Sequence, residues 1–383
     1  MANISESVLR EPRSGIRKIF EMSQSIPGAI HLEIGEPQFE TPEHIVAAGC
    51  KALRDGYTKY TPNAGIKELR EAVAQHRTAE YGYEVRPENI LVGIGGVEVI
   101  NAVFRALCEP GDEVLVPDPS WPNYKMMATI SSTKVVSYHL RPENGFYPDL
   151  AELEGLVTPR TKLLIVNSPS NPLGVVFDRA MMEKLVAFAE KHDIYLLSDE
   201  AYERILYSEQ YISPLKLKKS SHVIAAHTMS KTYAMTGWRI GYIIADEYVI
   251  DAVTKLQEAY VSSTPGAFQM AAVEALNGPQ DCVETMRAEY QRHRDNVAAI
   301  LDKAGIEYYM PAGAFYMWIK VGVPSQAFAE GLLLKKKVTV SPGCAFGTMG
   351  EDWVRISLAS SMEDLATGVS RLAEFLKKQQ LEK

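Results

Sequence analysis

The chain of 383 residues lacks the patterns that mark metal-binding, disulfide-bonded and membrane-spanning proteins. Its four cysteines are far apart and form no C-x-x-C pair, and its eight histidines include no H-E-x-x-H pattern. We therefore expect free thiols, a reducing environment and no metal ion. The most apolar segments are short and are interrupted by proline, glycine or charge, which excludes a membrane-spanning helix. No apolar stretch near the N-terminus resembles a secretory signal, so we expect a cytoplasmic protein.

The charge balance excludes some partners. The formal net charge is −8 and there is no block of basic residues, so we expect no binding to nucleic acid or to an anionic membrane surface. Apolar residues make up 46% of the chain and charged residues 23%, which is typical of a globular protein. The length allows two or three domains and a large core.

Between residues 88 and 245, short apolar runs alternate with helical patterns. Strands are expected at residues 89–94, 113–116, 162–166, 194–197, 222–226 and 240–245. Continuous apolar strands separated by helices predict an α/β fold, in which a mostly parallel sheet is covered by helices on both faces.

After residue 277 the pattern changes. A long polar helix is expected at residues 284–301 and a closing helix at 363–379, which together predict a smaller α+β domain. We therefore expect three parts in the chain. They are an N-terminal segment (1–40) that packs on the small domain, a large domain (41–276) and a small C-terminal domain (277–383).

The residues that follow each strand are candidates for a site, because open α/β sheets bind ligands at the carboxyl ends of their strands. After the first strand, Gly95, Gly96 and Val97 open a helix whose free N–H groups could hold a phosphate. Glu98 stands where a dinucleotide fingerprint has its last glycine, which disfavours a nicotinamide enzyme. The alternative is a glycine-rich turn that binds nothing.

Three further strands end in aromatic or polar residues. Trp121 is fixed between two prolines and offers a flat face for stacking, unless it packs on the core. Asn171, at the tip of a proline-rich turn, can donate to a ligand oxygen or bond locally. Asp199, at a buried strand end, needs a positive partner or else caps the next helix. Tyr202 follows three residues later and could donate to the same ligand.

Lys231 follows the next strand, in the segment Thr228-Met229-Ser230-Lys231, and Arg239 lies shortly after it. A partly buried lysine beside cationic groups can stay partly deprotonated and form a Schiff base with an aldehyde. The alternative is an ordinary exposed lysine. A phosphate-binding turn, a ring for stacking, a hydrogen-bond donor to a ligand oxygen, a carboxylate and an amine together indicate pyridoxal phosphate. Enzymes that use this cofactor pair a lysine with an acidic partner for the pyridine nitrogen.

These blocks resemble the class I aminotransferases, which have the aspartate aminotransferase fold (fold type I of the pyridoxal phosphate enzymes). The resemblance runs from the Gly35-Glu36-Pro37 segment to the Arg355-Ile356-Ser357 segment. It includes an N-S-P-x-N-P-x-G block at 167–174, a D-E-x-Y block at 199–202 and an S/T-x-S-K…R block at 228–239. It implies a large domain with a mostly parallel seven-stranded sheet and a smaller α+β domain. It also implies ping-pong transfer of an amino group between an L-amino acid and a 2-oxo acid.

The resemblance implies roles for individual residues. Lys231, Asp199 and Tyr202 would be catalytic: Lys231 bonds to the cofactor and moves the proton, Asp199 pairs with the pyridine nitrogen, and Tyr202 bonds the ring oxygen together with Asn171. Trp121 would stack on the ring. The phosphate would be held by Gly95, Gly96, Val97, Thr228, Ser230, Arg239 and, from the neighbouring subunit, Tyr60. The substrate would be held by Gly35, Trp121, Asn171 and Arg355, of which Arg355 grips the α-carboxylate. The position of Tyr60 implies a homodimer.

The substrate side chain is less constrained. Some aspartate-specific relatives carry a lysine where this chain has Val97, and no second cationic group is evident, so neutral or aromatic donors are favoured, with 2-oxoglutarate as acceptor. A carbon–sulfur β-lyase or a related elimination enzyme would use the same residues and is an alternative. A ligand-sensing regulatory protein on the same fold is a more distant one, because no basic helix-turn-helix pattern precedes the first motif.

Overall fold

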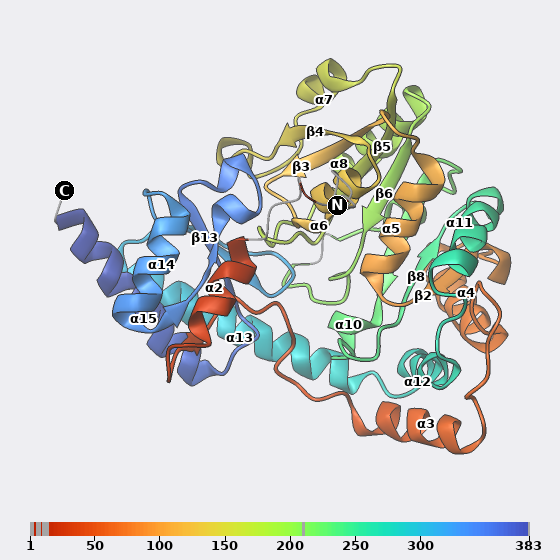
Figure 1. Ribbon diagram of the computed structural model, residues 1–383, viewed down its shortest axis with the longest axis horizontal. Coiled ribbons are helices and arrows are strands. Elements are labelled where there is room, and N and C mark those ends of the chain that lie inside the picture. Colours follow the sequence, from red (N-terminus) through yellow and green to blue (C-terminus); the bar gives the residue numbers. More distant parts are fainter. Residues whose placement is uncertain (1–3, 5–8, 10–14, 209–210, 382–383) are drawn as a thin grey trace.

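A seven-stranded sheet forms the centre of the computed structural model, which describes residues 15–208 and 211–381 and positions 4 and 9 (Figure 1). Its strands are β2 (Ile90–Gly93), β3 (Glu113–Asp118), β4 (Lys134–His139), β5 (Thr161–Asn167), β6 (Tyr195–Asp199), β7 (Val223–Thr228) and β8 (Gly241–Ile244). They are arranged in the order β2-β8-β7-β6-β5-β3-β4, and only β8 runs antiparallel to its neighbours. The mostly parallel sheet is therefore confirmed.

One strand of this sheet was not among those expected from the sequence. β4 is an edge strand that pairs only with β3, and most of its residues are half-buried. Its sequence, KVVSYH, mixes polar and apolar residues because one side of an edge strand meets solvent. The continuous apolar run that marks the buried strands is therefore absent from it.

Helices cover both faces of the large sheet. One face is covered by α5 (Gly96–Leu107), α6 (Asn123–Ile130) and α11 (Glu247–Tyr260). The other is covered by α4 (Lys67–Tyr81), α7 (Leu150–Leu156), α8 (Arg179–Lys191), α9 (Pro214–Leu217) and α12 (Gly266–Asn277), and α3 (Glu43–Arg54) packs on α12. Along β5, Leu163 and Ile165 pack on the first face while Leu164 and Val166 pack on the second. The inner strands of the sheet bury both of their faces in this way, which accounts for their continuous apolar runs.

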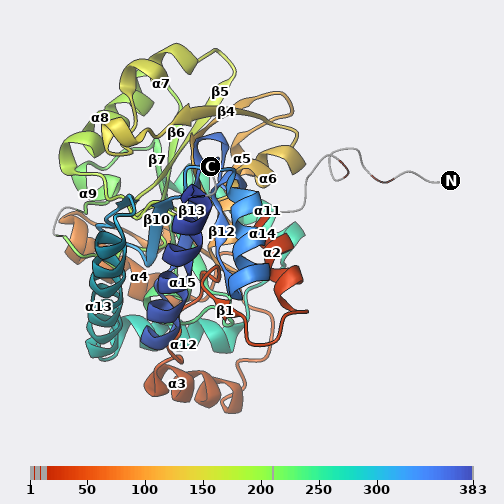
Figure 2. The same ribbon diagram turned by 90° about the vertical axis from the view of Figure 1, so that its left-hand side faces the viewer.

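A smaller antiparallel sheet and three long helices form the second part of the molecule. The sheet has the order β12-β13-β10-β9, from β9 (Tyr308–Tyr309), β10 (Tyr316–Lys320), β12 (Ser341–Pro342) and β13 (Trp353–Ser357). The helices are α13 (Asp281–Ala304), α14 (Ser325–Lys336) and α15 (Met362–Leu381). Figure 2 shows these helices side by side on one flank of the molecule. The smaller α+β domain is therefore present, and its residue boundaries stay a prediction.

The N-terminal part of the chain lies against this second part. Helix α2 (Gly15–Ser23) contacts α14 and β12, and strand β1 (Ile30–His31) pairs in parallel with β11 (Val338–Thr339). Residues 10–14, which belong to the predicted N-terminal segment, lie outside the described residues. Short 3₁₀ turns occupy Pro87–Asn89, Pro142–Asn144, Gly343–Ala345 and Thr348–Gly350, and a single helical turn, α10 (Met229–Thr232), follows β7.

Strands β2, β3, β5, β6 and β7 all run in one direction, so their carboxyl ends meet at one edge of the large sheet. The segments singled out in the sequence follow these strand ends. The fold therefore gathers them in one region, next to the small sheet and α2. None of the helices that the structure describes is long and apolar enough to cross a membrane.

Candidate active site

A cavity of about 700 Å³ opens at the carboxyl edge of the large sheet. Most of the residues expected to form a site line it: Gly35, Gly96, Val97, Trp121, Asn171, Asp199, Tyr202, Thr228, Ser230, Lys231, Arg239 and Arg355. They come from segments that are spread over more than three hundred positions of the sequence, roughly the span that separates Gly35 from Arg355. The fold therefore brings together what the sequence only suggested in pieces.

Lys231 lies on the single turn of α10, directly after β7. The hydroxyl of Thr228 accepts a hydrogen bond from the backbone N–H of Ser230 (3.2 Å), which caps the turn. The ammonium nitrogen of Lys231 donates to the carbonyl oxygen of Gly35 (2.7 Å). Burial lowers the pKa of Lys231 to about 8, although the carboxylate of Glu36 opposes the shift. A sizeable fraction of the amine is therefore neutral near physiological pH.

Asp199 ends β6 and is 6% exposed. One of its oxygens accepts a hydrogen bond from the hydroxyl of Tyr124 (2.5 Å), and the other accepts from the backbone N–H of Ala201 (3.1 Å). Burial raises the pKa of Asp199, and the hydrogen bond from Tyr124 opposes this. The alternative predicted from the sequence was that Asp199 caps the next helix, but a turn follows β6, and the bond to Ala201 lies within that turn and uses only one oxygen. Tyr124 was not singled out in the sequence, although it lies three positions after Trp121.

Arg355 is buried in β13 at the centre of a polar network. Its guanidinium donates to the side-chain oxygen of Asn171 (2.9 Å), to the backbone oxygen of Glu33 (2.5 Å) and to the hydroxyl of Ser341 (3.1 Å). Its carbon Cζ lies 4.2 Å from the ring centroid of Tyr316. Among the described residues, Nε of Arg355 has no hydrogen-bond partner although it is buried. This donor and the positive charge of the guanidinium are available to a bound anion.

Two tyrosines and a glycine lie side by side in the cavity. The hydroxyls of Tyr202 and Tyr316 are 2.8 Å apart, and burial raises the pKa of Tyr202 well above its usual range. A Cβ atom on Gly35 would lie 2.5 Å from the hydroxyl of Tyr316, so only glycine fits at this position. Tyr316 is another site residue that the sequence did not reveal, because it lies within an ordinary strand pattern.

The segment predicted to hold a phosphate combines glycines with an arginine. Gly95 has a φ of 88°, and a Cβ on it would lie 2.3 Å from Nη2 of Arg239. A Cβ on Gly241 would lie 2.6 Å from the backbone nitrogen of Gly96. No side chain caps the N-terminus of α5, which begins here, so its first N–H groups are available to an anion. Arg239 is tethered by donating to the backbone oxygens of Thr236 (2.9 Å) and Ile94 (3.2 Å).

Two of the expected residues do not line the cavity. Gly95 lies just behind it, beneath Arg239. Tyr60 is 90% exposed and is not among the residues that line the cavity of its own chain. An exposed tyrosine of this kind is available to a second molecule, which is what the resemblance implied for it.

Helix α2 contributes residues that were not expected in the site. Ile16, Arg17 and Phe20 line the cavity beside Val97 and Trp121. From the sequence, no second cationic group for a substrate side-chain carboxylate was evident, and the structure adds one arginine, Arg17, to the cavity lining. It could not be found from spacing, since α2 precedes all the recognised motifs and reaches the cavity only through its packing on the small sheet.

The donor set fits pyridoxal phosphate. A glycine cradle with an arginine suits its phosphate, a buried carboxylate suits its protonated ring nitrogen, and a lysine of lowered pKa suits its aldehyde. The glycines follow β2, the carboxylate of Asp199 ends β6 and Lys231 follows β7, so these groups lie at the carboxyl ends of different strands of the large sheet. The fold and the cavity together define a pyridoxal phosphate enzyme of fold type I.

Comparison with known proteins narrows this class. Residues 27–372 match the family model described as aminotransferase class I and II. The chain is 40% identical to the aspartate aminotransferase of Pyrococcus horikoshii over 97% of each chain. It is 38% identical to aromatic-amino-acid aminotransferase 2 of Thermococcus litoralis, over 96% of this chain and 97% of that one. A solved structure of Thermus thermophilus aspartate aminotransferase, 37% identical, superimposes with a TM-score of 0.94 and covers 98% of this chain and 100% of its own.

The chain belongs to the class I and II aminotransferase family and has the aspartate aminotransferase fold. It is therefore a pyridoxal phosphate-dependent aminotransferase. The resemblance stated from the sequence motifs is confirmed for the family, the fold and the cofactor.

Proposed function

We propose that the enzyme transfers an amino group from a neutral or aromatic L-amino acid to a 2-oxo acid by a ping-pong mechanism, with Lys231 as the base. The proposal is carried by the convergence of Lys231, Asp199 and Arg355 on one cavity. A base, a partner for an electron-poor ring and a carboxylate-binding arginine are the three groups that this reaction requires.

The residues that would hold the cofactor surround Lys231. Asp199 would pair with the ring nitrogen, Asn171 and Tyr202 would bond the ring oxygen, and Trp121 would lie on the face of the ring. The phosphate would be held by Gly95, Gly96, Val97, Thr228, Ser230 and Arg239. When bound, pyridoxal phosphate supplies an electron sink that stabilises negative charge at the α-carbon of the substrate.

Lys231 moves the proton in this proposal. Its neutral amine would remove the proton from the substrate α-carbon. It would later deliver this proton to the cofactor carbon that carried the aldehyde. The carbonyl oxygen of Gly35 holds the amine at 2.7 Å, so the base has a fixed starting position. Burial favours the neutral form that acts as the base, because the charged form loses its hydration.

Arg355 and Asn171 orient the substrate. The guanidinium is already fixed by Asn171, Glu33 and Ser341, so little side-chain entropy is lost when a carboxylate binds. The unpaired Nε gives the incoming carboxylate a donor that has no competing partner among the described residues. A two-pronged grip on the α-carboxylate sets the α-proton towards Lys231.

The composition of the cavity supports neutral and aromatic donors. Its lining is largely apolar and includes Ile16, Phe20, Ile34, Val97 and Ile100. Large apolar side chains gain most from leaving water in such a setting. One relative is named an aromatic-amino-acid aminotransferase and another, from Thermus thermophilus, an aspartate/prephenate aminotransferase.

Arg17 adds one positive charge to the lining of this cavity. A dicarboxylic 2-oxo acid such as 2-oxoglutarate carries a second carboxylate that needs a cation. Arg17 is one of the residues that line the cavity. Its side chain is 67% exposed and pairs with Glu21 (3.3 Å). Because it is exposed, it can turn towards the cavity for the acceptor and away from it for an aromatic donor. We therefore assign the acceptor as 2-oxoglutarate.

We further propose a homodimer in which Tyr60 of the partner subunit reaches the phosphate. Tyr60 is 90% exposed and does not line the cavity of its own chain, so its contribution requires a second copy. A mixture of Lys231→Ala and Tyr60→Ala variants tests this, because each hybrid dimer would contain one site that carries both substitutions and one that carries neither. Recovery of activity on mixing supports the dimer, and no recovery despite subunit exchange contradicts it.

A half-reaction screen tests the proposed substrates. Each standard amino acid is added to the cofactor-loaded enzyme, and the change in cofactor absorbance is followed without any 2-oxo acid present. We expect the fastest changes with aromatic and large neutral amino acids. Release of the amino group as ammonia, together with pyruvate and with the cofactor left in its aldehyde form, would instead identify an elimination enzyme.

A further inference from the structure

Glu98 stands where a dinucleotide-binding fingerprint would have its last glycine, and it has no role in the mechanism above. It is the third residue of α5, directly after the turn predicted to hold the phosphate. One of its oxygens, Oε2, accepts a hydrogen bond from the backbone N–H of Ile94 (3.2 Å). The side chain therefore reaches back from the helix onto the turn that precedes it.

The same residue of the turn is bound by Arg239. Nη2 of Arg239 donates to the carbonyl oxygen of Ile94 (3.2 Å), so Ile94 accepts from Arg239 and donates to Glu98. Arg239 is exposed and has a φ of 55°, a conformation that residues other than glycine adopt at a cost. The direction of its side chain therefore depends on the carbonyl oxygens that tether it.

The glycines on either side of Ile94 make room for these two side chains. A Cβ on Gly93 would clash with Oε2 of Glu98, and a Cβ on Gly95 would clash with Nη2 of Arg239. The N–H of Gly95 is used by the carbonyl oxygen of Gly93 (3.0 Å). Glu98 thus takes the N–H of Ile94 and leaves the N–H groups of the first two residues of α5 to the phosphate.

The setting of the Glu98 carboxyl suits a neighbour of a phosphate. Its Oε1 is buried and has no hydrogen-bond partner among the described residues. Burial raises the pKa of Glu98 to about 7, although the N–H of Ile94 and the side chain of Gln257 oppose the shift. A sizeable fraction of the carboxyl is therefore uncharged near pH 7, and it repels an anion at the start of α5 less than a full carboxylate would.

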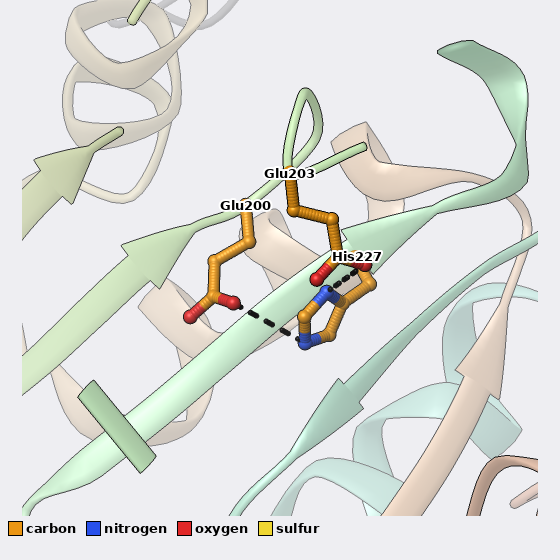
Figure 3. Close-up of side chains that lie close together, drawn as sticks. All are labelled: Glu200, Glu203 and His227. Atoms are coloured by element: carbon orange, nitrogen blue, oxygen red, sulfur yellow. Dashed lines mark hydrogen bonds and ion pairs between the residues drawn. The ribbon is translucent and has the colours of Figure 1, made fainter. Parts of the chain in front are cut away.

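Two glutamates beside the cavity-lining residue His227 are bound differently. Glu200 and Glu203 follow β6 and face His227 of β7 (Figure 3). Glu203 accepts from Arg77 on both oxygens (2.8 and 2.5 Å), and Glu200 accepts from a hydroxyl group on each of its oxygens. All four carboxyl oxygens are thus paired within the protein, whereas Glu98 is bound through one oxygen only, and that bond is to the turn.

We propose that Glu98 is a positioning residue: its carboxyl oxygen holds the N–H of Ile94 and thereby fixes the carbonyl oxygen that tethers Arg239 for the phosphate. Without this acceptor the N–H of Ile94 loses its partner, and a buried donor without a partner is costly. The turn would relax to satisfy it, and the tether of Arg239 would move with the turn. This inference rests on the proposed role of Gly96, Val97 and Arg239 in holding the phosphate.

The experiment compares two ligands that differ only in the phosphate. Pyridoxal has the ring and the aldehyde of pyridoxal phosphate but no phosphate group. The affinity of the full chain, freed of cofactor, is measured for each ligand by absorbance, and the ratio of the two affinities reports the phosphate contacts alone. Arg239→Gln tests the proposed phosphate site itself and should lower this ratio. An unchanged ratio in that variant would show that the phosphate is bound elsewhere.

Three substitutions of Glu98 test the inference. Glu98→Met keeps the length of the side chain but loses the acceptor, so the affinity for pyridoxal phosphate should fall about tenfold while that for pyridoxal is unchanged. Glu98→Asp keeps the carboxyl but is one carbon too short to reach Ile94. It should behave like Glu98→Met, and it replaces that variant should the methionine protein not fold. Glu98→Gln keeps an acceptor oxygen at the same reach, so it should bind pyridoxal phosphate at least as tightly as the wild type.

Other patterns overturn the inference. A wild-type ratio in Glu98→Met, beside a lowered ratio in Arg239→Gln, removes the role of Glu98 and leaves the proposed function standing. An equal loss for both ligands means that Glu98 acts only through packing, and a Glu98→Gln variant as weak as Glu98→Met means that the oxygen is not what matters. Thr78→Val is the matched control, because Thr78 accepts from the backbone N–H of Val85 (2.9 Å) and does not line the cavity. It should leave both affinities unchanged, and circular dichroism checks that each variant is folded.

Discussion

The amine of Lys231 donates a 2.7 Å hydrogen bond to the carbonyl oxygen of Gly35, which lies 196 positions earlier in the chain. This bond connects the large sheet to the segment that leads from α2 and β1. The group proposed as the base is thus held by a backbone atom rather than by a second side chain. A backbone carbonyl does not titrate, so this acceptor is present at every pH.

Replacement of Lys231 with Ala should abolish turnover. General base assistance contributes about 10²–10⁴-fold, and the covalent attachment of the cofactor is lost as well. Steady-state assays would measure the rate, and visible absorbance would report the attachment. Lys184→Ala on the exposed face of α8 is the control and should behave like the wild type. Unchanged transamination by the Lys231 variant would rule out the proposed base.

The rate at which cofactor-free enzyme captures pyridoxal phosphate should depend on pH. The neutral amine of Lys231 attacks the aldehyde, and its pKa of about 8 means that the protonated form dominates at lower pH. Below pH 8 the rate should therefore fall by about tenfold for each pH unit, and above it the rate should level off. Stopped-flow absorbance would follow the capture. Pyridoxamine phosphate cannot bond to a lysine, so its binding should not follow the same profile.

Replacement of Tyr124 with Phe should weaken cofactor retention in acid. The tyrosine hydroxyl stabilises the ionised form of Asp199, and without it the pKa of Asp199 rises further. Binding that needs the carboxylate is present above this pKa and is lost as the pH falls through it. The midpoint of cofactor loss should therefore move up by about one pH unit. Tyr138→Phe, another fully buried tyrosine, is the control. Equal midpoints in all three proteins would contradict the role given to Tyr124.

Replacement of Arg355 with Lys should impair every substrate to a similar degree. A lysine keeps the charge but loses the two-pronged grip, and a charge-assisted hydrogen bond contributes about 1.5–3 kcal/mol. The value of kcat/KM should fall about 10- to 100-fold for donors and acceptors alike. A loss confined to dicarboxylic substrates would instead place the α-carboxylate elsewhere.

Replacement of Arg17 with Gln should affect only the dicarboxylic acceptor. The exposed guanidinium would contribute about 0.2–1 kcal/mol, so KM for 2-oxoglutarate should rise about 2- to 5-fold. The half-reaction with an aromatic donor should be unchanged. Lys18→Gln is the control, because Lys18 is on the same helix but pairs with Glu330 of α14 (2.7 Å). An equal effect of both substitutions would indicate a general role of α2 in packing.

Local patterns were enough to locate the expected strand ends. Buried strands of a parallel sheet are apolar on both faces, so β5 and β6 stand out in the sequence, whereas the half-exposed edge strand β4 does not. The residues after those strands were found because parallel strands place their carboxyl ends at one edge. The roles of these residues stay a proposal until the variants are measured.

The sequence by itself determined the buried strands of the large sheet, the segments at their ends and the family, because these depend on neighbouring residues and on motifs of fixed spacing. Only the tertiary structure decided which distant side chains complete the site. Tyr124 reaches Asp199, Tyr316 meets Tyr202, and Arg17 enters the cavity. Such contacts join side chains that are remote along the chain, and no local periodicity encodes them. They exist because helices and sheets bury their apolar faces against one another, and this packing fixes where each polar side chain must lie.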